Sequence, residues 1–273
     1  MAEGSLRLLR PDDLPGAMEL SRLAGWNQTI DDWHMLLRLE PQGCFVIELD
    51  NLIVATTTLL CYGTTLAWIG MVLTRPEYRR RGLARRLMEK ALECASARKI
   101  GSVKLDATAD GQPLYEKLGF KTEQIIQRWF LDVTPQNASG KTPAPTSTPL
   151  PLEMDAHAFG ADRSALFQEL VTRNRPHTSS DAFSFSRSGS RCNYLGPCVA
   201  KDPSSARGVI EETLRVWPPS SWYWDLLNTN KAALDLAAAL SFAPQRRLER
   251  MAIGDHLVKN DQMVYAIAGF ELG

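Results

Sequence analysis

The stretch that decides the fold runs from Leu66 to Arg86 and reads LAWIGMVLTRPEYRRRGLARR. Its first part is apolar and predicts a buried strand, its middle is a charged turn, and Gly82 stands directly before the start of a helix. Backbone N–H groups that crowd around a glycine at a helix N-terminus favour an anion, because the helix dipole is positive there. The stretch therefore predicts a cradle for phosphate oxygens.

Composition limits what the rest of the chain can do. The 273 residues suggest about two domains, and the 31 basic side chains balance 31 acidic ones, which argues against a nucleic-acid surface at the arginines of 75–86. The five cysteines are scattered, without the spacing of a disulfide framework or a metal site. No signal core or membrane span stands out. We expect a cytoplasmic monomer or homodimer with no metal, membrane or nucleic-acid partner.

Hydrophobic periodicity predicts an α/β (α+β) fold for a first domain at residues 1–135. The expected strands lie at 5–10, 43–49, 52–61, 66–73, 102–107 and 123–133, and the expected helices at 14–23, 30–39, 82–99 and 113–118. The strand at 123–133 is expected to close this unit.

The second half repeats this order after a linker. Residues 136–151 are rich in proline, serine and threonine and predict the linker. In a second domain at 152–273, Ser241-Phe242 stands 122 residues after Gly119-Phe120 (241 − 119). A spacing this long indicates a duplicated domain rather than a solenoid repeat. Strands are expected within 182–200 and at 221–227 and 246–253, and helices at 162–172, 204–216 and 231–240.

Two motifs in the first half give the chain a family resemblance. Arg79, Gly82 and Ala84 fit the pattern Gln/Arg-x-x-Gly-x-Gly/Ala, and Leu114-Tyr115 stands a few residues before Gly119-Phe120. Over residues 5–133 the chain resembles the GNAT superfamily of acetyl-CoA-dependent N-acetyltransferases. It is similar to a bacterial subgroup with a divergent second GNAT-like C-terminal domain in the segments 25–27, 160–163 and 268–273.

The resemblance implies a tandem GNAT-like fold, in which a mixed, mostly antiparallel sheet is flanked by helices. It also implies acetyl-CoA as cosubstrate and a set of site residues. The backbone of Met71, Val72 and Leu73 would pair with the pantetheine arm as an added strand. Tyr115 would protonate the departing thiolate as general acid, although it also fits a core aromatic. The pyrophosphate would be bound by Arg79, Arg80, Arg81, Gly82, Leu83, Ala84 and Arg85.

The acceptor site is expected between the first two helices, where Trp26, Asn27 and Asp31 are the candidate substrate-binding residues. An aromatic group beside an acid suits a cationic amine, although Asp31 also fits a helix cap. A general base stays unassigned, because the strand at 66–71 carries no acid. A water molecule, Asp106 or an amine that is already neutral are the alternatives, and Asp106 fits a structural role equally well.

The second half lacks the sequence features of a CoA site. Between residues 200 and 208 neither the arginine nor the glycine stands at the required spacing, and Ala237 takes the place of Tyr115. We therefore expect one catalytic centre, in the first half. The leading hypothesis is an N-acetyltransferase that transfers an acetyl group to a primary amine of a small molecule by direct attack. A protein lysine or N-terminal acetyltransferase and a non-catalytic CoA-binding sensor are the alternatives.

Overall fold

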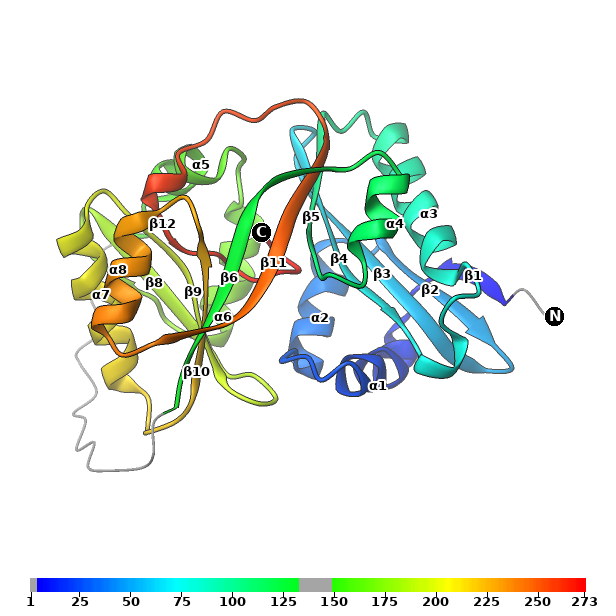
Figure 1. Ribbon diagram of the computed structural model, residues 1–273, viewed down its shortest axis with the longest axis horizontal. Helices are drawn as coiled ribbons and strands as arrows, with labels where there is room; N and C mark the ends of the chain where they lie inside the picture. The colour runs from blue at the N-terminus through cyan, green and yellow to red at the C-terminus, as the bar shows by residue number, and fades with distance from the viewer. Residues whose placement is uncertain (1–3, 133–148) are drawn as a thin grey trace.

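The computed structural model describes residues 4–132, called the first half below, and residues 149–273, called the second half (Figure 1). Most of the linker predicted at 136–151 lies outside the described residues. The strands of the first half are β1 (Ser5–Leu8), β2 (Cys44–Leu49), β3 (Leu52–Tyr62), β4 (Leu66–Thr74), β5 (Ser102–Ala107) and β6 (Lys121–Leu131). Its α-helices are α1 (Leu14–Leu23), α2 (Ile30–Leu39), α3 (Leu83–Ala97) and α4 (Gln112–Lys117).

The elements of the first half agree with the predicted ones to within a few residues, and local sequence explains several boundaries. Helix α2 starts after Thr29, whose hydroxyl accepts the Asp32 N–H at 3.3 Å while the Asp32 carboxylate accepts the Thr29 N–H at 2.7 Å. This reciprocal capping box satisfies two N–H groups at the helix start. Asp50 and Asn51, between β2 and β3, both have positive φ, as a two-residue hairpin turn requires.

The second half contains three elements that periodicity did not predict, α5, β7 and β12. Helix α5 covers Leu152–Phe159, and β7 (His177–Thr178) and β12 (Val264–Ala266) are short strands. The other strands are β8 (Ala182–Arg187), β9 (Asn193–Ala200), β10 (Trp222–Leu227) and β11 (Ala243–Gly254). The other α-helices are α6 (Ser164–Arg173), α7 (Pro203–Val216) and α8 (Lys231–Ala239).

The two halves share one sheet and exchange their last long strands. The strand order is β1-β2-β3-β4-β5-β11-β6-β10-β9-β8-β7, with β12 paired to β9. Strand β11 of the second half pairs with β5, strand β6 of the first half pairs with β10, and β6 and β11 pair with each other (Figure 1). The prediction that the strand at 123–133 closes its own unit was wrong, because β11 lies between β5 and β6.

Matching backbone contacts before β6 and β11 confirm the internal duplication. The Phe120 N–H donates to the Tyr115 carbonyl at 3.0 Å, and the Phe242 N–H donates to the Ala237 carbonyl at 3.0 Å. The residue before each phenylalanine has positive φ, which ends a helix in the manner of a Schellman motif. Ala237 is therefore the structural counterpart of Tyr115.

Two buried arginine–aspartate pairs hold the exchanged strands. Arg250 on β11 donates to both carboxylate oxygens of Asp106 on β5, at 2.8 and 2.9 Å. Arg128 on β6 donates to both oxygens of Asp225 on β10, at 2.8 and 2.7 Å. Bidentate guanidinium–carboxylate pairs are geometrically specific. Each pair therefore fixes the register between a strand of one half and a strand of the other.

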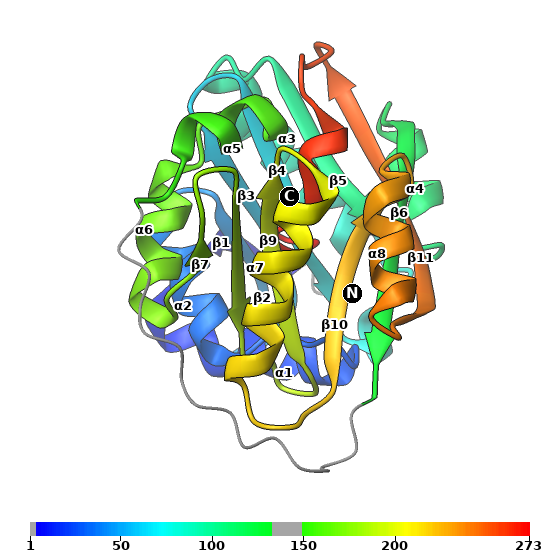
Figure 2. The same ribbon diagram turned by 90° about the vertical axis from the view of Figure 1, so that its left-hand side faces the viewer.

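Apolar cores lie on both faces of the shared sheet. Helix α3 packs on one face through Leu87 and Met88, together with Tyr115 of α4. The opposite face of β4 packs against α1 and α2 of the first half and against α5 and α6 of the second half. Helices α7 and α8 cover β8, β9 and β10 (Figure 2). The second half therefore forms a wall over one face of β4.

Candidate functional site

Strands β4 and β5 are parallel and pair over only three residues of each, Leu66–Trp68 and Ser102–Lys104. Beyond this point the edge of β4 that faces β5 has no strand partner among the described residues. Met71 lies at the start of the unpaired edge with φ of 51°, and its carbonyl accepts the Thr56 hydroxyl at 2.8 Å. A left-handed conformation is strained for a side chain such as methionine, and such strain concentrates at functional sites.

The unpaired edge leads to the N-terminus of α3. Gly82 is the N-cap with φ of 79°, and no side chain caps the first turn of the helix. A Cβ at Gly82 would meet no protein atom within 4 Å. The N–H groups at a helix start attract anions through both hydrogen bonding and the helix dipole. The start of α3 is therefore uncapped and open at the place where the sequence predicts an anion cradle.

The arginine side chains of this loop bind mostly to the loop itself and to α3. Arg79 Nε donates to the Thr74 carbonyl at 3.3 Å, and Arg81 donates to the Glu77 carbonyl at 2.9 Å. Arg85 pairs with Glu89 one turn along α3, at 2.8 Å. These contacts shape the loop and keep its positive charge at the surface. None of these contacts caps the backbone N–H groups at the start of α3.

Tyr115 lies on α4 with its ring buried, in the same core as Leu83 of α3 and Leu105 of β5. The ring packs edge-on against Phe120, with ring centroids 6.3 Å apart. The hydroxyl makes no hydrogen bond to any described residue. Burial raises the pKa of Tyr115, so the phenol keeps its proton at neutral pH. A protonated phenol without a protein partner is a suitable proton donor.

The second half fills its equivalent of the unpaired strand edge. Strands β9 and β10 are also parallel over three residue pairs. Strand β12 then pairs with β9 at Cys198 and Val199, and the Tyr265 carbonyl accepts the Trp224 Nε1 of β10 at 2.7 Å. In the duplicated sequence Cys198-Val199 corresponds to Val72-Leu73. Strand β12 therefore occupies the site in the second half that corresponds to the unpaired edge of β4 in the first half.

The N-terminus of α7 is also filled by the chain itself, whereas that of α3 is open. Asp202 caps α7, and its Oδ1 accepts the N–H groups of Ser204 and Ser205 at 2.9 and 3.0 Å. The carboxylate takes the position that an external anion would need and would also repel it. Only the first half of the described chain thus combines an unpaired strand edge with an uncapped helix start.

The three predicted acceptor residues differ in burial and in contacts. Asn27 is buried, and its Oδ1 accepts the N–H groups of Arg191 and Cys192, each at 3.0 Å, in the loop between β8 and β9. Trp26 is half-buried in the loop after α1, and Asp31 is exposed on the first turn of α2. Asn27 therefore joins the two halves, and an acceptor-binding role of these residues stays a prediction.

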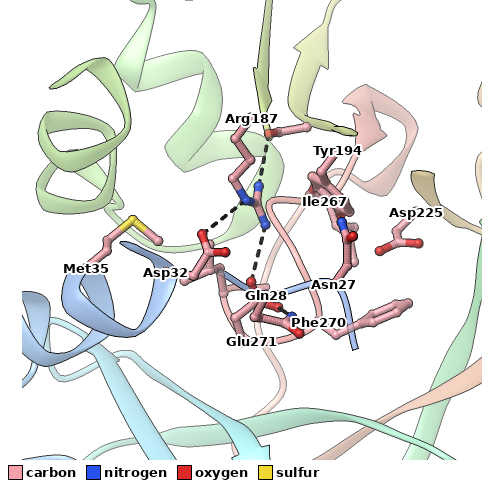
Figure 3. A network of polar contacts seen from close by, with 12 residues as sticks. Asn27, Gln28, Asp32, Met35, Arg187, Tyr194, Asp225, Ile267, Phe270 and Glu271 are labelled. Carbon is pink, nitrogen blue, oxygen red and sulfur yellow. Dashed lines mark hydrogen bonds and ion pairs between the residues drawn. The ribbon is translucent and has the colours of Figure 1, made fainter. Parts of the chain in front are cut away.

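Four buried side chains that the sequence analysis did not single out meet beside α2 (Figure 3). Gln28 Nε2 donates to Glu271 Oε2 at 2.9 Å. Arg187 lies between two carboxylates, with its Nη2 at 3.3 Å from Glu271 Oε1 and its Nε at 3.7 Å from Asp32 Oδ1. These residues come from three distant segments, so no spacing in the sequence signals them.

The segment that carries Glu271 lies directly on β4. A Cβ at Gly70 would stand 2.8 Å from the Cα and 2.9 Å from the Cβ of Glu271, so only glycine permits this contact. Trp68 Nε1 also donates to the Phe270 carbonyl at 2.9 Å. Glu271 therefore lies on the face of β4 that the second half covers, next to the strained Met71.

Asp106, one of the alternatives for a general base, has a structural role. Its side chain is fully buried, and Arg250 holds both of its oxygens. Both oxygens of this carboxylate are therefore engaged by the same arginine. Among residues 4–132 and 149–273 no cluster of His, Cys, Asp or Glu side chains is arranged to hold a metal ion. None of the helices in these ranges is long and apolar enough to cross a bilayer.

Comparison with known proteins agrees with the fold and with its duplication. Two family models, each described as an acetyltransferase (GNAT) domain, match residues 40–122 and 152–266. An uncharacterized N-acetyltransferase of Bacillus subtilis, YitH, is 28% identical over 172 residues, which is 60% of this chain. The match spans 59% of the length of that relative.

Solved structures show the same fold over nearly the whole chain. A candidate acetyltransferase from Pyrococcus horikoshii superposes with a TM-score of 0.85 at 23% identity, over 100% of this chain and 97% of that one. A tandem GNAT protein from the clavulanic acid biosynthesis pathway has a TM-score of 0.60 at 15% identity, over 92% and 98% of the two chains. With two matching domains and this shared architecture, the chain belongs to the GNAT acetyltransferase family, as a tandem member.

Proposed function

We propose that this protein is an N-acetyltransferase that uses acetyl-CoA in its first half and acetylates a primary amine. The contrast between the two halves carries the proposal. Strand β12 lies against β9 in the second half, which demonstrates that an extended segment fits beside a strand of this geometry. The pantetheine arm is a similarly extended chain with amide groups, and it would lie against Met71, Val72 and Leu73 in the same manner.

The anion cradle supports a site for the pyrophosphate of CoA. Phosphate oxygens would accept the N–H groups at the start of α3, where no side chain competes for them. Gly82 allows the ligand to approach the backbone closely because it has no Cβ. The arginines at 79–81 and Arg85 would add electrostatic attraction from the rim of the cradle.

Tyr115 is the proton donor in this proposal. As the amine nitrogen bonds to the thioester carbon and the carbon–sulfur bond breaks, the Tyr115 hydroxyl donates its proton to the sulfur. The raised pKa of Tyr115 keeps that proton in place until the sulfur carries negative charge. Ala237 offers no such group at the equivalent position of the second half.

The division of labour between the halves follows from these features. We assign acetyl-CoA binding and catalysis to a domain at 1–135, joined by a linker at 136–151 to a GNAT-like domain at 152–273 without a CoA site. The second half covers the face of β4 from which the acceptor would approach, through α5, α6 and the segment 267–273. This cover favours a small amine over a lysine or N-terminus on a folded protein.

Thiol release from acetyl-CoA tests the proposal directly. A panel of small primary amines and lysine-containing peptides should show acceptor-dependent release, with the small amines faster. Gly82→Glu should abolish CoA binding, measured by titration calorimetry, because it places a bulky anion in the cradle. Gly208→Glu, an exposed position on α7 with no protein atom within 4 Å of a Cβ, is the matched control and should bind normally.

Two results would contradict the proposal. Unchanged CoA affinity in Gly82→Glu would overturn the cradle. Tight CoA binding without amine-stimulated thiol release across the panel would favour a CoA-binding sensor.

A further inference from the structure

We propose that Glu271, with Gln28 beside it, forms the seat for the acceptor ammonium group, and that Glu271 is the general base of the reaction. This inference rests on the acetyl transfer proposed above. It names a residue of the second half as part of a catalytic centre whose other groups all belong to the first half.

Position is the first argument. The backbone of Glu271 touches Gly70, next to the strained Met71 where the unpaired edge of β4 begins. An acetyl group at the end of a pantetheine arm along Val72 and Leu73 would reach this part of β4. The covering segment therefore brings Glu271 against β4, a strand that carries no acid of its own.

The second argument is that arginine side chains hold the Glu271 carboxylate less firmly than they hold the other buried carboxylates. Each of the other buried aspartates has a close arginine: Asp106, Asp225 and Asp155 are held through both oxygens at 2.6–3.0 Å. Asp32, in the same cluster as Glu271, accepts a hydrogen bond from Arg173 at 2.6 Å. Glu271 has weaker restraint, from the neutral Gln28 amide at 2.9 Å and a longer Arg187 contact at 3.3 Å. Among these buried carboxylates, Glu271 therefore has the longest contact with its nearest arginine.

An unused acceptor atom beside Glu271 is the third argument. The Gln28 side chain is only 8% exposed, and its Oε1 is buried without any hydrogen-bond partner among the described residues. The amide orientation is set by the Nε2 contact with the Glu271 carboxylate, which can only accept. A buried carbonyl oxygen without a partner is costly. An ammonium group, which has three N–H donors, would satisfy this oxygen and the carboxylate together.

The surroundings set the proton affinity of the carboxylate. Burial raises the pKa of Glu271, while Arg187 opposes the rise. The charged and titratable groups that act on it come from several elements: Arg187 on β8, Asp32 on α2, Arg128 on β6, Tyr194 on β9 and Tyr62 on β3. A carboxylate with a raised pKa is a better base, because it holds a transferred proton closer to neutral pH.

The proton balance of the step is complete with these groups. The bound ammonium gives one proton to Glu271 and becomes a neutral amine, whose nitrogen then bonds to the thioester carbon. The carbon–sulfur bond breaks, and Tyr115 donates its proton to the sulfur. The nitrogen loses its second proton as the amide forms, and that proton restores Tyr115. Glu271 returns its proton to solvent, so one proton is released per turnover.

The test is Glu271→Gln, which keeps shape and removes the charge. With the fastest small amine of the panel at pH 7, kcat should fall about 10²- to 10³-fold, with CoA affinity unchanged. The deficit should shrink as the pH approaches the pKa of the amine, about 10.4 for an alkylamine such as a lysine side chain, because free amine then needs no base. Glu169→Gln removes the carboxylate of a surface pair with Arg38 and should change neither quantity.

A second variant, Gln28→Met, should raise KM for the amine about tenfold and change kcat less, because it removes a contact made by the bound ammonium. If Glu271→Gln does not fold, Glu271→Asp keeps the charge and should keep the wild-type pH dependence at a reduced rate.

Turnover by Glu271→Gln equal to that of the wild type at pH 7 would overturn the inference and leave the proposed function standing. A deficit that stays constant with pH would reduce Glu271 to a structural contact. Absence of CoA binding or thiol release in the wild type would instead overturn the proposed function itself.

Discussion

The Gly82→Ala variant allows an effect on CoA binding to be distinguished from an effect on the stability of the fold. Gly82 has φ of +79°, and a Cβ added there would meet no protein atom within 4 Å, so the substitution costs only the strain of a left-handed backbone, about 1 kcal/mol. Gly63, in the turn between β3 and β4, has φ of +60° and equally free surroundings. Gly63→Ala is therefore a matched control. Both variants should lose about 1 kcal/mol of unfolding free energy, or roughly 2–4 °C in Tm.

The two variants should differ in CoA affinity. In Gly82→Ala the new methyl group stands where the pyrophosphate must approach the N–H groups of α3. One lost hydrogen bond to a charged oxygen is worth about 1.5–3 kcal/mol, which weakens Kd about ten- to a hundredfold. Calorimetry measures Kd and thermal melting measures Tm. An unchanged Kd in Gly82→Ala would refute the cradle, and equal losses in both variants would show that affinity only follows stability.

Two further predictions address the proton donor and the strand exchange. Tyr115→Phe should lower kcat about ten- to a thousandfold with little change in Tm, because the hydroxyl has no partner among the described residues to lose; unchanged turnover would make Tyr115 a core residue only. Arg250→Met leaves the buried Asp106 without its counter-charge and should cost about 3–5 kcal/mol in urea unfolding. Arg128→Met should cost a similar amount through Asp225. Losses below about 1 kcal/mol would show that these pairs do not hold the exchanged strands.

Local signals made most helices and strands of the chain predictable. The capping box at Thr29 and the turn at Asp50-Asn51 are encoded within a few residues, and periodicity extends the elements from such points. The strand exchange has no local signal. Strands β6 and β11 carry similar patterns because they are copies, and each satisfies the same pairing rules in its own half or in the other. Strand β12 has only three residues, too few for a period to show.

The proposed site divides in the same way. The residues predicted to bind the cofactor, 71–73 and 79–85, lie in one stretch of sequence, so a family motif was enough to propose them. Gln28, Arg187 and Glu271 are far apart in the chain and meet only through packing of the two halves. Asn27 stood out in a loop, but its partners lie 164 and 165 residues away and give it a structural contact. Sequence alone could not distinguish that contact from a ligand contact.

A crystal structure of the protein with bound CoA tests the central claim most directly. The account predicts one CoA per chain, with the pyrophosphate on the N–H groups at the start of α3 and the pantetheine beside Val72 and Leu73. Its sulfur should lie near the Tyr115 hydroxyl. CoA bound at the start of α7, or bound in both halves, would contradict the account.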